Sequence, residues 1–242
     1  MDAPREIRSA TGEIPTRIPG ITFGSTFEKL ARLNDKFSIV RSFATGDANH
    51  DIKPIVGRDT LRANMGTLYA RVAGALRPDT AMPTNVALFP RAVDMASGPA
   101  ITQFGNFEST GEFGSAYAPF VPGAGGGLQA DMKLNLPQTR LHDRHALLSS
   151  LDQWKHRLQA SGTFDGTDTF QQQAFAALER GLSDAFDLQR EDPRVVARYD
   201  TAPLMARDRF SPAWKNREHY ADNSATLGKL LLLARRLCER GA

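Results

Sequence analysis

Apolar residues recur at helical spacing in two long stretches of the chain. One stretch predicts a helix from about residue 58 to residue 76, and the other predicts a final helix that starts at Asn223-Ser224. Gly241 follows the last apolar position of the final helix, where a glycine commonly ends a helix in the left-handed conformation. The predicted apolar faces are Leu61, Met65, Leu68, Val72 and Leu76 in the first helix and Leu227, Leu230, Leu231, Ala234 and Leu237 in the second.

Shorter elements are predicted elsewhere in the chain. Ser25-Thr26 caps a predicted helix that runs to about Lys36, and Asp192-Pro193 caps a short helix with proline at its first position. Two runs of strand-forming residues, 37–43 and 86–89, predict buried strands. Two further helical stripes are Leu147, Leu151, Trp154 and Leu158, and Phe170, Ala174, Ala177, Leu178, Gly181 and Ala185.

Together these elements predict a single partial α/β domain over residues 1–242. We expect a sheet-containing part over 1–96, a glycine-rich loop segment over 97–137 and a helical part over 138–242. The middle segment has weak periodicity, and loops of this length often carry function. Its glycine-rich run at 123–127 lacks the Gly-Lys-Ser/Thr of a phosphate-binding loop and is interpreted as a flexible loop.

Charge and composition argue against several classes of protein. The 30 basic and 27 acidic residues give a net charge of only +3, and no basic block is present, so nucleic-acid binding is not expected. No 18-residue apolar run is present, which argues against a membrane span, and the first residues lack the apolar core of a signal peptide. The single cysteine, Cys238, excludes an intramolecular disulfide and is predicted to be a small buried hydrophobe.

The densest group of chemically active side chains follows the first predicted strand. Thr45, Asp47, Asn49, His50 and Asp51 lie within seven residues, in a polar loop of the kind found at the carboxyl edge of α/β sheets. Hard oxygen and imidazole ligands suit a divalent metal ion, and a base near an anion-stabilising group suits hydrolysis. Asp, Asn and Gly are also the ordinary residues of turns, so a plain turn is the alternative interpretation of this loop.

A pair of histidines lies at the start of a later predicted helix. His142 and His145 are three residues apart and share a helix face, which would let both rings bind one metal ion. No third ligand is evident nearby in the sequence. A solvated first turn of the helix is therefore favoured.

Several stretches resemble, in the same order, the DUF1501 proteins, a bacterial family of the alkaline phosphatase-like (sulfatase-like) group. One of them is Asn49-His50-Asp51, within the polar loop described above. Each stretch is modest alone, and the ordered set covers nearly the whole chain. The matching stretches are residues 2–8, 27–35 continuing into 38–42, 49–51, 114–120, 140–152, 185–188 and 230–242.

The resemblance implies an α/β fold with an alkaline phosphatase-like central sheet and flanking helices, incomplete in this chain and helix-rich in its C-terminal half. It implies a metal-centred site at the carboxyl edge of that sheet. Family members carry ligand-like segments upstream and downstream, so the chain resembles the family's middle portion and lacks both flanking segments. Such relatives look exported to the periplasm or the exterior.

From this resemblance we expect a segment of a metal-dependent hydrolase of phosphate or sulfate esters that is not catalytic by itself. His50 and Asp51 would bind the metal or act as acid and base, and Asn49 would contact the anion. The metal would be zinc or calcium, and the substrate a small anionic ester. Thr45 would be the nucleophile, although the group's usual spacing, about ten residues before Gly57, falls on Asp47. Either the register differs, Thr45 serves, or the family does different chemistry.

The alternative is a noncatalytic binding or interaction module, or a truncated gene product. It rests on the incomplete ligand set and on the nucleophile spacing. In either case, apolar helix faces such as the stripe over Leu227–Leu237 would be exposed if core strands are missing, and the chain would then self-associate.

Overall fold

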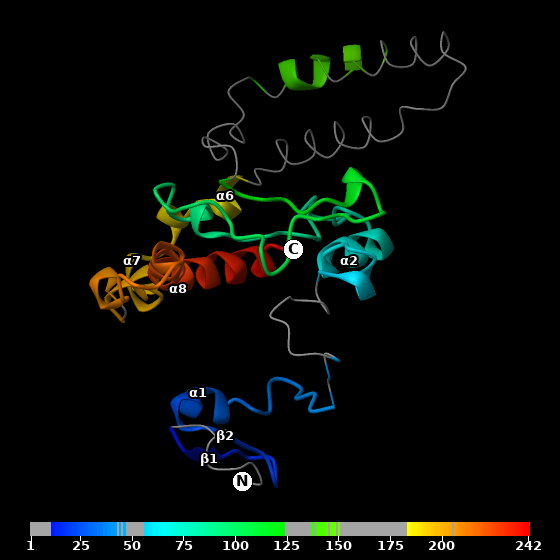
Figure 1. Ribbon diagram of the computed structural model, residues 1–242. Helices are drawn as coiled ribbons and strands as arrows, with labels where there is room; N and C mark the ends of the chain where they lie inside the picture. The colour runs from blue at the N-terminus through cyan, green and yellow to red at the C-terminus, as the bar shows by residue number, and fades with distance from the viewer. Residues whose placement is uncertain are drawn as a thin grey trace. The chain divides into compact units, whose positions relative to one another are not determined.

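The computed structural model describes residues 11–42, 44, 46, 56–123, 137, 139–144, 146–148, 150, 183–204 and 206–242. The chain divides into two compact units, Met1–Ala48 and Asn49–Ala242. Figure 1 shows the strands in the first unit and the long helix α8 in the second. The described residues form a mixed structure of helices with one small two-stranded sheet, which is broadly α/β.

The first unit is built on a β-hairpin. Strands β1 (Glu13–Pro15) and β2 (Thr22–Gly24) pair antiparallel, with Ile14 opposite Phe23. The hairpin continues into the 3-10 helix η1 (Ser25–Phe27) and the four-residue helix α1 (Glu28–Ala31). The helix predicted up to Lys36 is therefore shorter than expected, and its last residues form hydrogen-bonded turns instead.

The strand predicted over residues 37–43 is not formed in the part of it that the structure describes, 37–42. Phe37 stacks on Phe23 of β2, with ring centroids 6.2 Å apart, and Val40 is 74% exposed. A strand needs a neighbouring strand for its backbone hydrogen bonds. Within the described part of this unit, the only paired strands are β1 and β2, so strand-forming side chains alone do not produce a strand here.

The second unit has four labelled α-helices, α2 (Met65–Ala73), α6 (Ser183–Phe186), α7 (Pro193–Arg198) and α8 (Arg217–Glu239), among its described residues. Its predicted strand over 86–89 appears as an isolated parallel bridge between Val86 and Phe120. Short 3-10 helices connect these elements; they are η2 (Arg58–Thr60), η3 (Pro90–Ala92), η4 (Ser115–Tyr117), η5 (Leu188–Arg190), η6 (Ala202–Leu204) and η7 (Arg207–Arg209).

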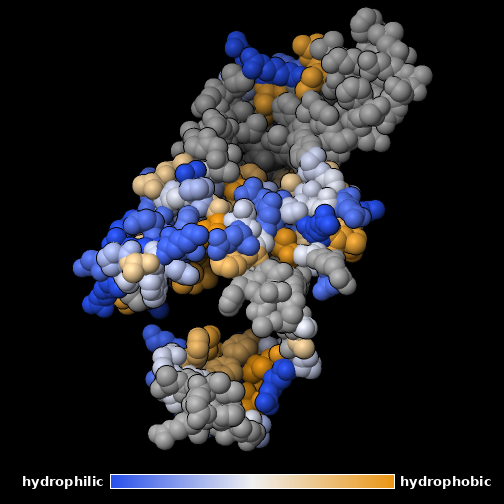
Figure 2. Space-filling model, in the orientation of Figure 1, coloured by the Kyte–Doolittle hydropathy of each residue, from blue (hydrophilic) through white to orange (hydrophobic). Residues whose placement is uncertain are grey.

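Helix α2 begins later than the apolar spacing predicts. Leu61 and Arg62 both have positive φ, which a helix cannot contain, and Asn64 then caps α2 by accepting the Thr67 N–H at 2.9 Å. The buried residues of α2 are Thr67 and Ala70, whereas Val72, on the predicted apolar face, is 89% exposed. Figure 2 shows apolar surface over this helix.

The ends of α7 and α8 agree with the sequence prediction. The Asp192 side chain accepts the Arg194 N–H at 2.8 Å, and Pro193 occupies the first position of α7. At the end of α8, Gly241 has φ 91°, its N–H donates to Cys238 O, and the Ala242 N–H donates to Leu237 O. This pair of bonds is a Schellman motif, which satisfies carbonyls that a helix end otherwise leaves without donors.

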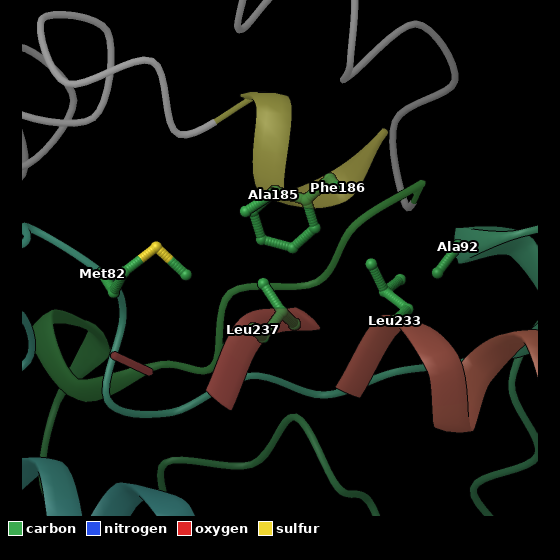
Figure 3. Packing of buried hydrophobic residues seen from close by; sticks show 6 residues of the cluster. All are labelled: Met82, Ala92, Ala185, Phe186, Leu233 and Leu237. Atoms are coloured by element: carbon green, nitrogen blue, oxygen red, sulfur yellow. The ribbon is translucent and has the colours of Figure 1, made fainter. Parts of the chain in front are cut away.

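The core of the second unit lies along one side of α8. Phe186 of α6 and Leu233 and Leu237 of α8 are almost completely buried and pack with Met82 and with Ala92 of η3 (Figure 3). The ring of Phe186 also contacts the ring of Phe120, with centroids 5.1 Å apart. The full buried cluster is Met82, Ala92, Ala185, Phe186, Leu233 and Leu237.

The apolar stripe predicted for the final helix is only partly correct. Leu237 is buried, but Leu227 and Leu231 are exposed, while Leu232 and Leu233 are fully buried. Cys238 is exposed and not buried as predicted. The reason is that α6, η3 and η6 all contact α8, so the buried face is wider than one stripe and rotated from it. Self-association through this helix stays a prediction.

Helix α8 approaches the chain after α7 so closely that only glycine fits at position 228. A Cβ on Gly228 would lie 1.6 Å from Tyr199 O, and the Gly228 N–H donates to Thr201 Oγ1 at 3.0 Å. We expect Gly228→Ala to lower the free energy of unfolding by about 2 kcal/mol, because the backbone contact has to open. In an exposed helix the same change would stabilise by about 1 kcal/mol.

Urea unfolding of Gly228→Ala shows whether the substitution lowers or raises the free energy of unfolding. Asn223→Ala, at an exposed position five residues earlier in α8, is the control and should not destabilise the protein. A Gly228→Ala protein as stable as the wild type would show that the contact with Tyr199 is looser than described.

Membrane insertion gains no support from the helices. Among the described residues, none of the helices combines the length and the apolar character that crossing a bilayer requires.

Candidate functional site

The four residues predicted to carry the chemistry lie outside the described residues. They are Thr45, Asn49, His50 and Asp51. Their roles as nucleophile, anion contact and metal ligands therefore stay predictions. His145 also lies outside the described residues, and its predicted partner His142 is exposed on a helical turn.

The polar loop is anchored at its downstream end by described residues. Val56 is buried and forms an isolated antiparallel bridge with Asn64, the cap of α2. The Gly57 N–H donates to the Thr60 hydroxyl at 2.9 Å, and that hydroxyl donates to Ala63 O at 2.6 Å. Position 56 is thus fixed beside the N-terminus of α2, five residues after Asp51.

A cavity of about 560 Å³ lies at this same end of α2. Its walls come from the first residues of α2, from the segment 84–89 and from Phe107. The volume is within the range typical of small-molecule sites. The lining residues are Asn64, Met65, Gly66, Thr84, Asn85, Val86, Ala87, Leu88, Phe89 and Phe107, none of which is ionisable.

A buried polar network forms the floor of the cavity. Asn85 donates through Nδ2 to Tyr117 O at 3.2 Å and to Thr67 Oγ1 at 3.4 Å, and the Thr67 hydroxyl also approaches Tyr117 O at 3.1 Å. Because a carbonyl oxygen can only accept, these contacts fix which way the Asn85 amide faces. Its oxygen lies over Gly66, where an added Cβ would be 2.0 Å from it.

A second hollow, of about 550 Å³, lies in the first unit. It is lined mainly by Phe23, Phe27, Leu30 and Phe37, with Thr22 and Gly24 at its edge. These side chains offer apolar surface without acid, base or ligand groups. Its described lining thus offers apolar contacts and no group for acid–base or metal chemistry.

The family model for DUF1501, described as a protein of unknown function, matches residues 2–242. The chain belongs to the DUF1501 family. No curated protein and no solved structure matches it. The match covers both the polar loop and the α2 cavity of this DUF1501 chain, so neither lies outside the family's own sequence.

In the described part of this DUF1501 chain, no cluster of three or more His, Cys, Asp or Glu side chains could hold a metal ion. Zinc sites in proteins use at least three protein ligands, and calcium sites use six to eight oxygens. A metal site with three or more such ligands would therefore include residues outside the described part, and the polar loop is the candidate that the sequence offers. His50 and Asp51 supply two ligands, and further ligands would have to come from elsewhere.

A serine, a histidine and an aspartate lie close together at the start of α8, but the aspartate binds groups other than the histidine. Asp222 accepts the Gly98 N–H at 2.8 Å and pairs with Arg207 at 2.5 Å. Gly98 also lies beside His219, while the neighbouring Ser97 hydroxyl is buried and has no hydrogen-bond partner among the described residues. A nucleophilic triad needs a histidine that is oriented by its acid and bonded to its serine, and neither bond is present in this described group.

Two exposed ion pairs shift pKa values, and none of their residues lines either cavity. The Lys36 ammonium, a backbone hydrogen bond and the nearby Arg17 hold the pKa of Asp35 below its ordinary value. Glu239 raises the pKa of Arg235 through a hydrogen bond. Neither shift marks a catalytic group.

Sequence reasoning did not identify the α2 cavity. Its network consists of two side chains, Thr67 and Asn85, and the backbone carbonyl of Tyr117, and these groups are separated by up to 50 residues. The one sequence signal for this region is Asn64 before an apolar run, because asparagine is a frequent helix cap and so indicates that a helix starts there.

Proposed function

We propose that the chain is a segment of a metal-dependent hydrolase of phosphate or sulfate esters. The observation that carries the proposal is the loop of Thr45, Asp47, Asn49, His50 and Asp51, within a sequence that matches one family model from residue 2 to residue 242. The match supports the resemblance on which the hydrolase assignment is based. It leaves the chemistry of DUF1501 itself open, since the family is described only as of unknown function.

The proposed chemistry follows from the kinds of side chain in the loop. His50 and Asp51 would hold a divalent metal, and the chemistry that the metal would supply is neutralisation of charge on the ester and activation of a nucleophile. The Asn49 amide contacts the anionic oxygens, and Thr45 is the candidate nucleophile. The resemblance would place the loop at the carboxyl edge of an alkaline phosphatase-like central sheet, although residues 37–42 before the loop form no strand in the structure.

Because two ligands do not complete a metal site, the assay uses two forms of the protein. One is the chain itself, and the other is the chain extended at both ends wherever its reading frame continues. Each is incubated with an aryl phosphate and an aryl sulfate in the presence of Zn²⁺, Ca²⁺ or Mn²⁺. We expect metal-dependent release of the aryl alcohol by the extended form.

Variants assign that activity to the loop. We expect His50→Ala and Asp51→Ala to lower the rate at least about 100-fold, the usual size of a lost acid, base or ligand. His142→Ala is the matched control, because His142 is exposed on a helix outside the loop. Activity in neither form, or equal activity in His50→Ala and the wild type, would contradict the proposal.

A noncatalytic binding module is the second candidate function. The α2 cavity favours it, because it has the size of a ligand site and its described lining contains no acid, base or nucleophile other than the neutral hydroxyl of Thr84. Such a cavity can bind a molecule and has no ionisable group with which to transform it. The two candidates therefore concern different parts of the chain.

A further inference from the structure

We propose that the cavity at the N-terminus of α2 binds a neutral organic ligand, an amide attached to an aromatic or similarly apolar body. The proposal goes beyond hydrolysis and does not depend on it, because no described wall of the cavity belongs to the polar loop at 45–51. It depends on three features of the described residues around the cavity: one acceptor and two donors that have no partner among them, and a lining without an ionisable side chain.

The acceptor is the amide oxygen of Asn85. Asn85 is 8% exposed, its Nδ2 is fixed on Tyr117 O and Thr67 Oγ1, and its Oδ1 accepts no hydrogen bond from the described residues. This oxygen lies against Gly66, and Asn85 and Gly66 both line the cavity. It is therefore the acceptor that we assign to a donor on the ligand.

The donors are the backbone N–H groups of Met65 and Gly66. They open α2, so they have no carbonyl one turn earlier in the helix, and neither donates to an acceptor among the described residues. The next N–H, that of Thr67, is already taken by the Asn64 side chain. Met65 and Gly66 both line the cavity beside Asn85.

An amide matches this arrangement with both of its polar atoms. Its N–H donates to Asn85 Oδ1, and its carbonyl oxygen accepts from Met65 or Gly66. The first N–H groups of a helix favour an anion by about 0.3–1 kcal/mol. A carboxylate, however, has no hydrogen to donate to Asn85 Oδ1, so it would set two acceptor oxygens against each other and would lose its water in a lining without an ionisable side chain among the described residues. The body of the ligand would contact Val86, Leu88, Phe89 and Phe107.

The test is an NMR titration of the 15N-labelled full chain with benzamide, compared with benzoate and phenyl phosphate. We expect one-to-one binding of benzamide with a Kd of about 1–10 mM, the range for a fragment of this size. Shifts should be largest at the amides of Met65 and Gly66 and at the Asn85 side chain. Benzoate and phenyl phosphate should bind at least about tenfold more weakly.

Variants locate the binding in the cavity. Phe107→Ala removes one aromatic wall and should weaken benzamide binding about 3- to 10-fold. Gly66→Ala should abolish it, because the added methyl group takes the place of Asn85 Oδ1. Val72→Ala is the control, since Val72 is on the same helix, is exposed and does not line the cavity.

Three outcomes would overturn the proposal. One is the absence of saturable benzamide binding up to about 50 mM. Another is benzoate binding as tightly as benzamide. The third is that Phe107→Ala and Val72→Ala weaken benzamide binding equally. Because Phe107 lies on a loop outside α2, this comparison can be made even if the Gly66→Ala protein fails to fold. Failure of the ester assay leaves all three outcomes unaffected, because the titration uses no metal.

Discussion

Replacing Arg236 with alanine is expected to lower the free energy of unfolding by about 3–5 kcal/mol. The guanidinium is nine-tenths buried and pairs with Glu191 at 2.6 Å. It also donates to Asp184 O at 2.9 Å and to Ala185 O at 3.3 Å. Its loss leaves the mostly buried Glu191 carboxylate without a partner and removes the donor that holds α6 on α8. Urea unfolding followed by circular dichroism measures the loss.

The neighbouring arginine provides the control. Arg235 is exposed and pairs with Glu239 one turn away on the same helix, and such exposed pairs contribute little because water screens them. We expect Arg235→Ala to leave the urea midpoint almost unchanged. Equal losses from the two substitutions would mean that Arg236 acts through helix propensity or overall charge rather than through its buried bonds.

Truncating Leu233 to alanine is expected to lower the free energy of unfolding by about 2–5 kcal/mol. Leu233 is fully buried in the cluster with Phe186 and Leu237 (Figure 3). Removing its side chain loses the transfer energy of the buried methyl groups and leaves a cavity that the surrounding residues fill only in part. The same urea titration detects this change as a lower midpoint at a similar slope.

Leu231→Ala makes the same chemical change two residues earlier in α8. Leu231 is 55% exposed, so its truncation should cost no more than about 0.5 kcal/mol. The difference between the two variants measures burial alone, because helix propensity changes equally in both. If Leu231→Ala destabilised as much as Leu233→Ala, the described rotation of α8 would be wrong.

The features that the sequence predicts well are those fixed by neighbouring residues. The cap at Asp192-Pro193 and the helix end at Gly241 depend on bonds that span two to five residues. DUF1501 membership is also confirmed, because it depends on an ordered set of stretches. The broad mixture of helix and strand is also predicted correctly. The alkaline phosphatase-like central sheet remains a proposal.

The features that the sequence predicts poorly depend on distant contacts. Helix α2 starts late because Asn64 is held by Ser109 O, 45 residues away, and because Gly111 lies against Leu61 O with no room for a Cβ. Likewise, the buried side of α8 is selected by α6 and η3 rather than by the spacing of its leucines. Periodicity locates apolar residues but does not identify which element will cover them.

The two candidate sites differ in the same way in how far the sequence predicts them. The loop at 45–51 is visible in the sequence because its reactive residues are adjacent. The α2 cavity is not, since the acceptor on Asn85 becomes available only when Tyr117 and Thr67 hold the other half of its amide. An isolated asparagine within an apolar run gives no sign of that arrangement.

A calorimetric titration of Zn²⁺, repeated with Ca²⁺ and Mn²⁺, into the full chain and its His50→Ala variant tests the metal site most directly. We expect one of these ions to bind one-to-one to the wild type, with an affinity that falls at least about tenfold in His50→Ala and is unchanged in His142→Ala. Equal binding by the wild type and His50→Ala, or no binding of any of the three ions, would contradict a metal site on this loop.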